Sequence, residues 1–396
     1  MLNYERGSEW RRWDLHIHTP GTLKNDQYEG GSLEEKWNNF YDAIAYYIGD
    51  GTNPLKAIEV IGVTDYLSID NYNKVMEEGR IPDSIKLVLP NVELRMVPLA
   101  KSAPINIHCI FDPAYASSLE SRFFSKLKFS FGDSSYSASH DELIRLGRDY
   151  QNDKMLSKDQ AYAIGINQFV LEFSSLKKIF DEDQELREHC IIVVSNSSGD
   201  GVSGVVEHSA YFQGDVSQMD ATRRAVYQFA DMIFSAKSSD IKYFIGESAD
   251  DCKKVIQKCG SLKPCIHGSD AHCCGKLFEP NEKRYCWIKA DPTFNGFRQV
   301  LYEPKERVRI SPIKPEPKPD YQVIDRVEIL DKEFAPTPIY FNDRLTCIIG
   351  GKSTGKSLLL HNMALAIDPT QVSEKISITK NSNKTITDVK VYWKDG

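Results

Sequence analysis

The sequence has no uninterrupted apolar run near the roughly 18 residues that a membrane helix needs, and no apolar stretch follows Met1. These absences argue against a membrane-spanning helix and an N-terminal secretion signal, so we expect a cytoplasmic protein with no membrane partner. An excess of basic charge is also missing, since the 396 residues carry a net charge of −7. This balance argues against a uniformly basic nucleic-acid coat, although a local basic groove remains compatible with it.

Cysteines at metal-binding spacing are absent as well, because none of the nine cysteines forms a C-x-x-C pair. Without a signal peptide we expect reduced thiols, most of them acting as small buried hydrophobes. Cys273 directly follows His272 and is a candidate for the wall of a metal pocket. The composition, 41% hydrophobic and 27% charged, is ordinary for a globular protein with a large core.

Histidine is scarce near the start of the chain, but two histidines lie together in the segment 13–19. In a strand, side chains alternate, so His16 and His18 would face one way and Leu15 and Ile17 the other. Two imidazoles at positions i and i+2 can hold a single divalent cation. This segment therefore predicts one half of a metal site.

The same spacing returns near residue 270, where Asp270 and His272 would also share one face of an extended segment. An alternative is that each pair is solvated or forms a satisfied part of the core. The presence of both pairs favours a chain that closes on itself around a metal.

Segments with strand and helix character alternate between these two pairs. Apolar, often β-branched runs predict strands at 57–64, 85–89, 92–97, 105–111, 190–194, 243–245 and 264–267. Helical patterns lie up to residue 48 and at 139–188, 222–234 and 250–259. The alternation favours a parallel α/β sheet or barrel, with the polar candidates at the carboxyl ends of strands, where such barrels have their active sites.

Proline then interrupts a charged run between Glu303 and Asp320, a composition typical of an extended linker. We therefore predict three parts. A first domain covers residues 1–310 and includes a helical insertion at about 139–189. A proline-rich linker covers 311–322, and a second domain covers 323–396, with strands at 323–330 and 339–341.

The candidate metal ligands are imidazoles and carboxylates spread over the first domain. They are His16, His18, Glu93, His108, Asp270 and His272, with Asp65 in the same series. This mixture suits Zn²⁺, Mn²⁺ or Fe²⁺ better than Ca²⁺ or Mg²⁺ alone. Clustered ions suit phosphate ester hydrolysis because they neutralise the phosphate and activate water.

The order of these motifs resembles that of a PHP (polymerase and histidinol phosphatase) domain over roughly residues 10 to 310. The resemblance rests on the His-x-His opening, Val63-Thr64-Asp65, Glu93, His108 and the closing Gly-Ser-Asp-Ala-His at 268–272. It implies a distorted (β/α)7 barrel with up to three metals that hydrolyses phosphomonoesters or phosphodiesters. When these motifs are matched to those of the family, the resemblance implies a main metal site of His16, His18, Glu93 and Asp270. The resemblance implies that His108 and His272 serve further metal sites and that the catalytic residues are Glu93, Asp65 and His272.

The sequence departs from this family at several histidine positions. Tyr66 stands where the family has a histidine after Thr-Asp, and no histidine occurs from residue 19 to 107. Ser195 and Asn196 occupy the region of a further family histidine. Possible substitutes elsewhere in the chain are His140, His189 and His208. We therefore expect one or two ions, with weakened or lost catalysis as an open alternative.

A second motif lies in the predicted C-terminal domain. An apolar run at 345–349, interpreted as a strand, leads into a G-x-x-x-x-G-K-S loop and a helical pattern at 358–367. The loop consists of Gly350, Gly351, Lys352, Ser353, Thr354, Gly355, Lys356 and Ser357. Backbone N–H groups of such a loop face phosphates, Lys356 adds charge, and Ser357 can hold Mg²⁺. ATP with Mg²⁺ is the predicted ligand, and an ordinary glycine-rich turn is the alternative.

With strands before the loop and a hairpin-like pattern at 375–393 after it, residues 323–396 resemble the opening of an ABC or SMC-type ATPase head. No Asp-Glu Walker B pair and no signature motif follow, so we expect an incomplete head. Together with the first domain, it resembles bacterial PHP–ATPase proteins of the TrlF type, some of them proposed to act in anti-phage defence. This resemblance implies a nuclease, acting on nucleic acid and most readily DNA, that is gated by ATP-driven association of heads into a homo-oligomer.

Two other functions stay open at this point. One is an ATP-dependent nucleic-acid sensor or scaffold with a degenerate barrel, which would bind no metal. The other is a small-molecule phosphatase, which would have a narrow, closed pocket. Candidates for phosphate contacts are Lys276, Arg284 and Lys289, each with a solvated surface role as the alternative.

Overall fold

The computed structural model describes residues 6–50, 52–100, 103–196, 220–315, 318–330, 338–379, 386 and 388–395. The chain divides into two compact units. The barrel unit is Trp10–Pro315, and the C-terminal unit is Glu316–Gly396 together with Met1–Glu9. The division between them falls within the proline-rich segment. Among the described residues, none of the helices combines the length and the apolar character that crossing a bilayer requires.

The barrel unit is built on one large mixed sheet with the strand order β10-β9-β8-β4-β3-β2-β1-β11-β12. Its strands are β1 Trp10–Ile17, β2 Ile58–Tyr66, β3 Leu87–Ala100, β4 Ala103–Phe111, β8 Cys190–Ser195, β9 Met232–Phe234, β10 Cys265–Ile266, β11 Cys286–Lys289 and β12 Val308–Ile310, with β7 Leu171–Glu172 beside β3. Neighbours in β1-β2-β3 and in β8-β9-β10 are parallel, whereas β4 is antiparallel to both β3 and β8.

The sheet curves so that the end of β1 meets the segment that follows β10. A parallel bridge joins Ile17 to Ala271. The N–H of Asp270 donates to the carbonyl of His16 at 2.8 Å, and the N–H of His18 donates to the carbonyl of Ala271 at 3.0 Å. The result is a nearly closed, barrel-like sheet in a mixed α/β unit, which agrees at this level with the expected α/β barrel.

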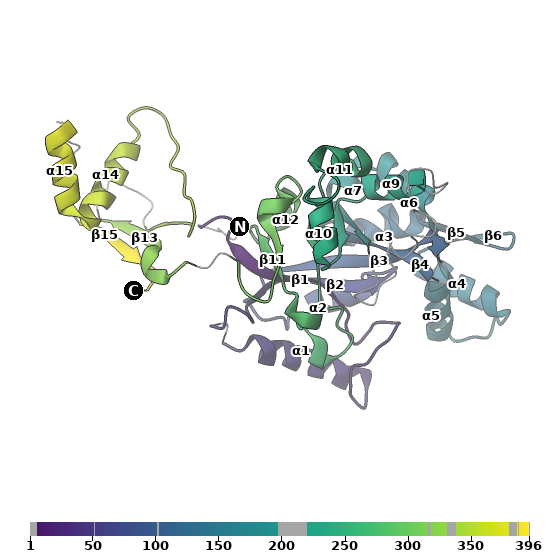
Figure 1. The fold of residues 1–396 in the computed structure, drawn as a ribbon. Helices are drawn as coiled ribbons and strands as arrows, with labels where there is room; N and C mark the ends of the chain where they lie inside the picture. The colour runs from purple at the N-terminus through teal and green to yellow at the C-terminus, as the bar shows by residue number, and fades with distance from the viewer. Residues whose placement is uncertain are drawn as a thin grey trace. The chain divides into compact units, whose positions relative to one another are not determined.

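Helices cover the outside of this sheet, with α1 on one side of the strands and α10 and α11 on another (Figure 1). The helix bounds are α1 Leu33–Ile48, α2 Asp70–Glu78, α3 Leu119–Arg122, α4 His140–Gln151, α5 Lys158–Gln168, α6 Phe173–Glu182, α7 Gln184–Glu188, α9 Asp220–Phe229, α10 Ser238–Phe244, α11 Cys252–Cys259, α12 Phe294–Gln299 and α13 Pro304–Arg307. The short hairpin β5 Lys128–Phe131 and β6 Ser134–Ser137 lies between α3 and α4 in the chain. The start of α1 is capped by the Ser32 side chain, which accepts from the N–H of Glu35.

Two buried clusters occupy the two faces of the sheet. One joins strand residues to helices such as α1, and the other joins strand residues to α12. Leu15 belongs to the second cluster and Ile17 to the first, so the expectation that they share a face is wrong. The reason is a register shift between β1 and β2 from Asp14 to Ile17, which interrupts regular alternation.

Three predicted elements of the barrel unit differ from the structure. Residues 243–245 are not a strand, because Tyr243 and Phe244 end helix α10 and the Phe244 ring packs against that of Tyr227 at 5.2 Å. The helix predicted at 222–234 ends at Phe229, and Met232–Phe234 pairs with β8 as strand β9. The strands predicted at 85–89 and 92–97 are one continuous strand, β3.

The C-terminal unit has a small antiparallel sheet with the order β14-β13-β15. Its elements are β13 Ile324–Ile329, β14 Ile339–Tyr340, α14 Lys356–Ile367, α15 Pro369–Thr379 and β15 Val389–Trp393. Its core is a small cluster of buried apolar residues, namely Val327, Ile329, Leu359, Met363 and Ile386.

Two predictions for this unit are wrong. Residues 345–349 are not a strand, and Leu345 and Ile349 are 75% and 90% exposed. A strand needs a neighbour to accept its backbone hydrogen bonds, and the described sheet does not extend to this run. The hairpin predicted at 375–393 is replaced by the end of helix α15 and by β15, which pairs with β13.

Candidate metal centre

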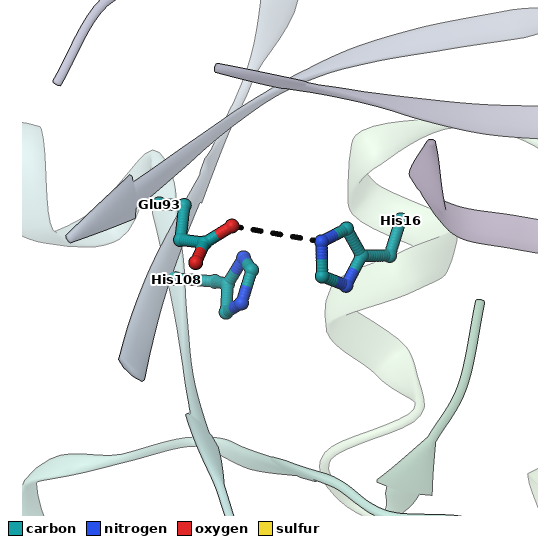
Figure 2. A group of neighbouring side chains, drawn as sticks. All are labelled: His16, Glu93 and His108. Atoms are coloured by element: carbon teal, nitrogen blue, oxygen red, sulfur yellow. Dashed lines mark ion pairs between the residues drawn. The ribbon is translucent and has the colours of Figure 1, made fainter. Parts of the chain in front are cut away.

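Five of the predicted ligands converge at the carboxyl end of β1. The first group contains His16, Glu93 and His108, whose ligand atoms lie within 4.8 Å of one another. Figure 2 shows the Glu93 carboxylate pointing at the His16 ring, with 3.6 Å between Oε2 and Nε2. All three side chains are buried.

A second group contains His16, His18 and Asp270, again with ligand atoms within 4.8 Å. The Nε2 atoms of His16 and His18 are 3.2 Å apart, and the Oδ1 atom of Asp270 lies 3.4 Å from the first and 3.5 Å from the second. Because His16 belongs to both groups, the two sets of donors are adjacent. This arrangement is suited to one ion or to two neighbouring ions.

Closure of the barrel is what places Asp270 beside the histidines. The Oδ1 atom of Asp14 accepts from the N–H of Ser269 at 2.9 Å and lies 3.3 Å from the N–H of His16. Gly268 is required in this contact, since a Cβ atom there would lie 2.5 Å from the backbone nitrogen of His16. The two halves of the predicted site, more than 250 residues apart in the chain, are therefore joined through backbone atoms.

A layer of asparagine side chains orients the ligands. The Nδ2 atom of Asn91 donates to the carbonyl of Leu15 and to Oγ1 of Thr64, both at 3.0 Å. This leaves Oδ1 of Asn91 as the acceptor, 3.1 Å from Nδ1 of His108. Nδ1 of His108 must then carry the proton, which leaves the lone pair on Nε2 available for a metal. Asn106 acts similarly on Glu93, donating to its Oε1 at 2.7 Å.

The electrostatics of the group follow from burial and from the mixture of charges. Burial alone would lower the pKa of His16, but the Asp270 and Glu93 carboxylates outweigh it and raise that pKa to about 9. Burial and the neighbouring His16 lower the pKa of His108 to about 3. Although burial opposes it, the surrounding histidines hold the pKa values of Glu93 and Asp270 below their usual range. Both carboxyl groups are thus anionic ligands at neutral pH.

In the two donor groups, two buried polar atoms have no hydrogen-bond partner among the described residues, namely Nε2 of His108 and Oε2 of Glu93. A buried polar atom left without a partner is costly, and both atoms are of types that bind divalent metals. The donor set and these orphaned atoms therefore fit a divalent cation.

His272 and Asp65 are placed differently from the five converging residues. The His272 ring stacks on that of His18 at 4.1 Å, and its Nε2 lies 3.5 Å from Oδ1 of Asp270, but it belongs to neither donor group. Asp65 accepts from the backbone and side-chain nitrogens of Asn71, at 2.9 and 2.5 Å, near the start of α2. The structure thus places His272 at the edge of the site and does not bring Asp65 into either group.

A cavity of about 240 Å³ opens beside Asp270 and His272. Cys273 and Lys276 line it, and Asn25 contributes from the loop after β1. Arg284 lines a different cavity, and Lys289 lies near the ring of Trp10. Among the predicted phosphate contacts, Lys276 is the one that this cavity includes.

The histidines suggested as substitutes do not join the site. The His140 ring contacts Tyr162 at 4.4 Å, and Nδ1 of His189 lies 2.9 Å from a carboxylate oxygen of Asp112. His208 lies outside the described residues.

The glycine-rich loop in the C-terminal unit leads directly into α14. Gly355 has a φ of 86°, in the left-handed region that glycine tolerates, and forms the N-cap of this helix. Nζ of Lys356 donates to the carbonyl of Gly350 at 2.8 Å, so the lysine folds back over its own loop. The loop and helix of the motif are present, but the strand that should precede them is not.

Asn91, Asn106 and Asp14 were not singled out from the sequence. Each acts on a ligand through a hydrogen bond, which leaves no recognisable spacing in the chain. A polar residue inside an apolar strand is the signal that could have found Asn91, because it interrupts the run 87–94.

Comparisons with known proteins assign no family. No family model matches the sequence, and no curated protein matches it. A solved structure from Bifidobacterium adolescentis, proposed as a metal-dependent phosphoesterase, aligns at 11% identity and a TM-score of 0.32, covering 69% of this chain and 92% of its own. An amidohydrolase from Chromobacterium violaceum, with bound sulfate and no metal, aligns at 12% identity and a TM-score of 0.33, covering 76% of this chain and 98% of its own. These similarities are too low to assign a function, so the site is interpreted from its own geometry.

Proposed function

We propose that the barrel unit is a metal-dependent phosphoesterase that hydrolyses phosphodiesters, with nucleic acid as its substrate. The observation that carries this proposal is the pair of donor groups sharing His16, with orphaned atoms on Glu93 and His108. Mixed imidazole and carboxylate donors suit Zn²⁺, Mn²⁺ or Fe²⁺. A bound divalent ion would offset the charge of a phosphate and lower the pKa of a nearby water molecule.

The residues of the chain have distinct roles in this proposal. His16, His18, Glu93, His108 and Asp270 would hold the ion or ions. Lys276, which lines the adjoining cavity, would attract the phosphate group by its charge. His272 stacks on His18 at the edge of the same cavity, and we assign it to proton transfer to the leaving oxygen. Asp65 is a less direct participant, because its oxygens are occupied by Asn71.

We further propose that residues 350–357 bind the phosphates of ATP with Mg²⁺ and that this binding regulates the hydrolase through association of C-terminal units. Support comes from the loop leading into α14 and from the left-handed Gly355 at the helix start. Anti-phage defence is the biological setting that we propose, on the sequence resemblance alone.

The test is to measure metal content and hydrolysis together. Purified protein with Mn²⁺ should bind the ion and cleave bis-p-nitrophenyl phosphate and a DNA oligonucleotide. In Glu93→Ala we expect the rate to fall by more than about 100-fold, since even residues outside the ligand set alter metal affinity or activity by about 10- to 100-fold. Glu77→Ala, at an exposed position on α2, is the matched control and should behave as wild type.

Two results would count against the proposal. Wild-type protein that binds no divalent ion would favour the scaffold function. Protein that binds the ion and cleaves a phosphomonoester but no diester would favour the small-molecule phosphatase.

A further inference from the structure

Arg95 lies on β3, two residues beyond Glu93. Residues at this spacing in a strand point to the same face of the sheet, so Arg95 lies on the face that carries the donor groups. Its side chain is partly buried. A cation therefore lies on the strand that supplies Glu93 and on the face of the sheet that carries the donor groups.

Arg95 has neither an ion pair nor a hydrogen bond with any described residue. The other buried arginines of the barrel unit are different. Arg11 donates to Glu59 at 2.9 Å and to the carbonyl of Ala290 at 2.8 Å, and Arg12 donates to the hydroxyl of Tyr47 at 2.8 Å. Arg95 is partly buried, and no carboxylate of the described residues forms an ion pair with it. Such a side chain is suited to an anion from outside the chain.

One contact of Arg95 connects it to the site. Its Cζ atom lies 5.4 Å from the ring centroid of Tyr66, and the Tyr66 ring stacks on that of His18 at 5.2 Å with 18° between the planes. Nζ of Lys24, from the loop after β1, lies 5.6 Å from the same Tyr66 centroid. Two cations from separate segments therefore share an aromatic ring that touches a candidate metal ligand.

We propose that Arg95 and Lys24 form a second anion subsite, which binds a phosphate group of the substrate other than the one being cleaved. The guanidinium group can bind two oxygens of one phosphate, and the Lys24 ammonium adds charge. The Tyr66 ring centroid lies 5.4 Å from Cζ of Arg95 and 5.2 Å from the His18 ring centroid. One substrate with two phosphates can therefore reach both the metal site and the Arg95 subsite. This inference rests on the proposed phosphoesterase function and makes compounds with at least two phosphates its preferred substrates.

Binding and turnover should be measured separately. Binding of the 5′-phosphorylated dinucleotide pdTpdT and of fructose 1,6-bisphosphate is measured by calorimetry on EDTA-treated protein, so that the result does not depend on metal or catalysis. In Arg95→Gln we expect at least about a tenfold loss of affinity for one of these probes, as for the loss of a charge-assisted pair. The probe with the larger loss identifies a nucleotide chain or a small bisphosphate as the source of the second phosphate.

With Mn²⁺ present, the KM for pdTpdT should rise in Arg95→Gln by about tenfold more than the KM for bis-p-nitrophenyl phosphate, which has a single phosphate. Lys24→Gln should change the same ratio in the same direction by a smaller factor. Arg95→Lys, which keeps the charge but not the two-pronged geometry, should be intermediate, and its unfolding curve checks that the fold is intact.

Arg80→Gln is the matched control, since Arg80 also lies over a tyrosine ring, that of Tyr41 at 4.4 Å, but on an exposed surface. It should bind both probes as wild type does. Equal affinity of Arg95→Gln and wild type for both probes would overturn the subsite, even if hydrolysis is intact. Loss of binding in Arg95→Gln, in a protein that hydrolyses nothing, would keep the subsite and refute the proposed reaction instead.

Discussion

The barrel unit and the C-terminal unit each contain a motif that is recognisable in the sequence, but the two motifs depend on the fold to different degrees. In the barrel unit, donors from β1, β3, β4 and the segment after β10 meet only because the sheet closes at Ile17 and Ala271. In the C-terminal unit, the phosphate loop is a contiguous segment next to α14. Its apolar lead-in forms no strand, and Leu345 and Ile349 are exposed, whereas Ile348 packs against the small core.

The difference shows what each kind of motif can and cannot predict. Contiguous glycines and a helix start need only local backbone geometry, so Gly355 and α14 form without a complete sheet. A strand needs a neighbouring strand to pair with, and a metal site needs side chains from distant segments to meet. Both conditions are met only in the assembled fold. Five predictions can break or sharpen this comparison, from the largest expected effect to the smallest.

The largest expected difference is in stability, between truncating a buried side chain of the barrel unit and truncating one in the apolar run 345–349 of the C-terminal unit. Phe297 is fully buried, with its ring 5.4 Å from that of Trp13, so Phe297→Ala should lower the free energy of unfolding by about 3–5 kcal/mol. Ile349→Ala, at a position 90% exposed, should change it by less than about 0.5 kcal/mol. Urea denaturation of both variants checks the pair, and similar losses would mean that the run 345–349 is packed after all.

Asp65 should make the stability of the barrel unit depend on pH. Burial raises its pKa from 3.8 to about 7, so the folded protein holds a proton that the unfolded chain releases. The stabilisation from this group is present below pH 4 and is lost as the pH rises to about 7, by at most about 4 kcal/mol. Asp65→Asn should remove this slope when unfolding is measured from pH 4.5 to 8. An unchanged slope would place the titrating group elsewhere.

Removal of the Asn91 amide should weaken metal binding by about 10- to 100-fold, the usual effect of residues that orient a ligand. In Asn91→Leu the proton of His108 is no longer directed to Nδ1, so both tautomers should appear in ¹⁵N NMR spectra. Asn91→Asp keeps an acceptor for Nδ1 and should retain the single tautomer, which separates orientation from simple loss of packing. A single tautomer in Asn91→Leu would contradict this role.

Metal binding should release a proton. The pKa of His16 is about 9 in the metal-free site, so at pH 7 its ring is protonated and must lose that proton to bind an ion. We expect Mn²⁺ affinity to rise up to about tenfold for each pH unit between 7 and 9, as seen by calorimetry in buffers of different ionisation enthalpy. Binding without proton release would mean that His16 is not a ligand.

The smallest expected effect is that of Lys356→Ala on the metal site. Lys356 contacts the carbonyl of Gly350 in its own loop, and its loss should remove ATP binding. Metal content should change by less than about twofold, because the metal donors all belong to the barrel unit. Metal analysis alongside a nucleotide-binding assay checks both, and a parallel loss of metal would reveal coupling between the two units.

Much of the site could be predicted from the sequence because its ligands are of distinctive types at distinctive spacings. The His16–His18 and Asp270–His272 pairs needed only strand periodicity to be recognised, and Glu93 and His108 followed from their order. The α/β alternation likewise predicted the class of fold. The same local rules failed at two places. Residues 232–234 form a three-residue strand because they pair with β8, and residues 243–244 end the short helix α10.

The sequence by itself determined the chemistry of the donors and the local geometry of the glycine-rich loop, since both are set by side-chain type and near-neighbour backbone preferences. Only the tertiary structure decided which donors meet, that Asn91 directs the proton of His108, and that Arg95 lies beside Tyr66 without an ion pair to any described residue. The physical reason is that hydrogen bonds and charges act over a few ångströms in space. Strand pairing and barrel closure bring those groups together across hundreds of residues.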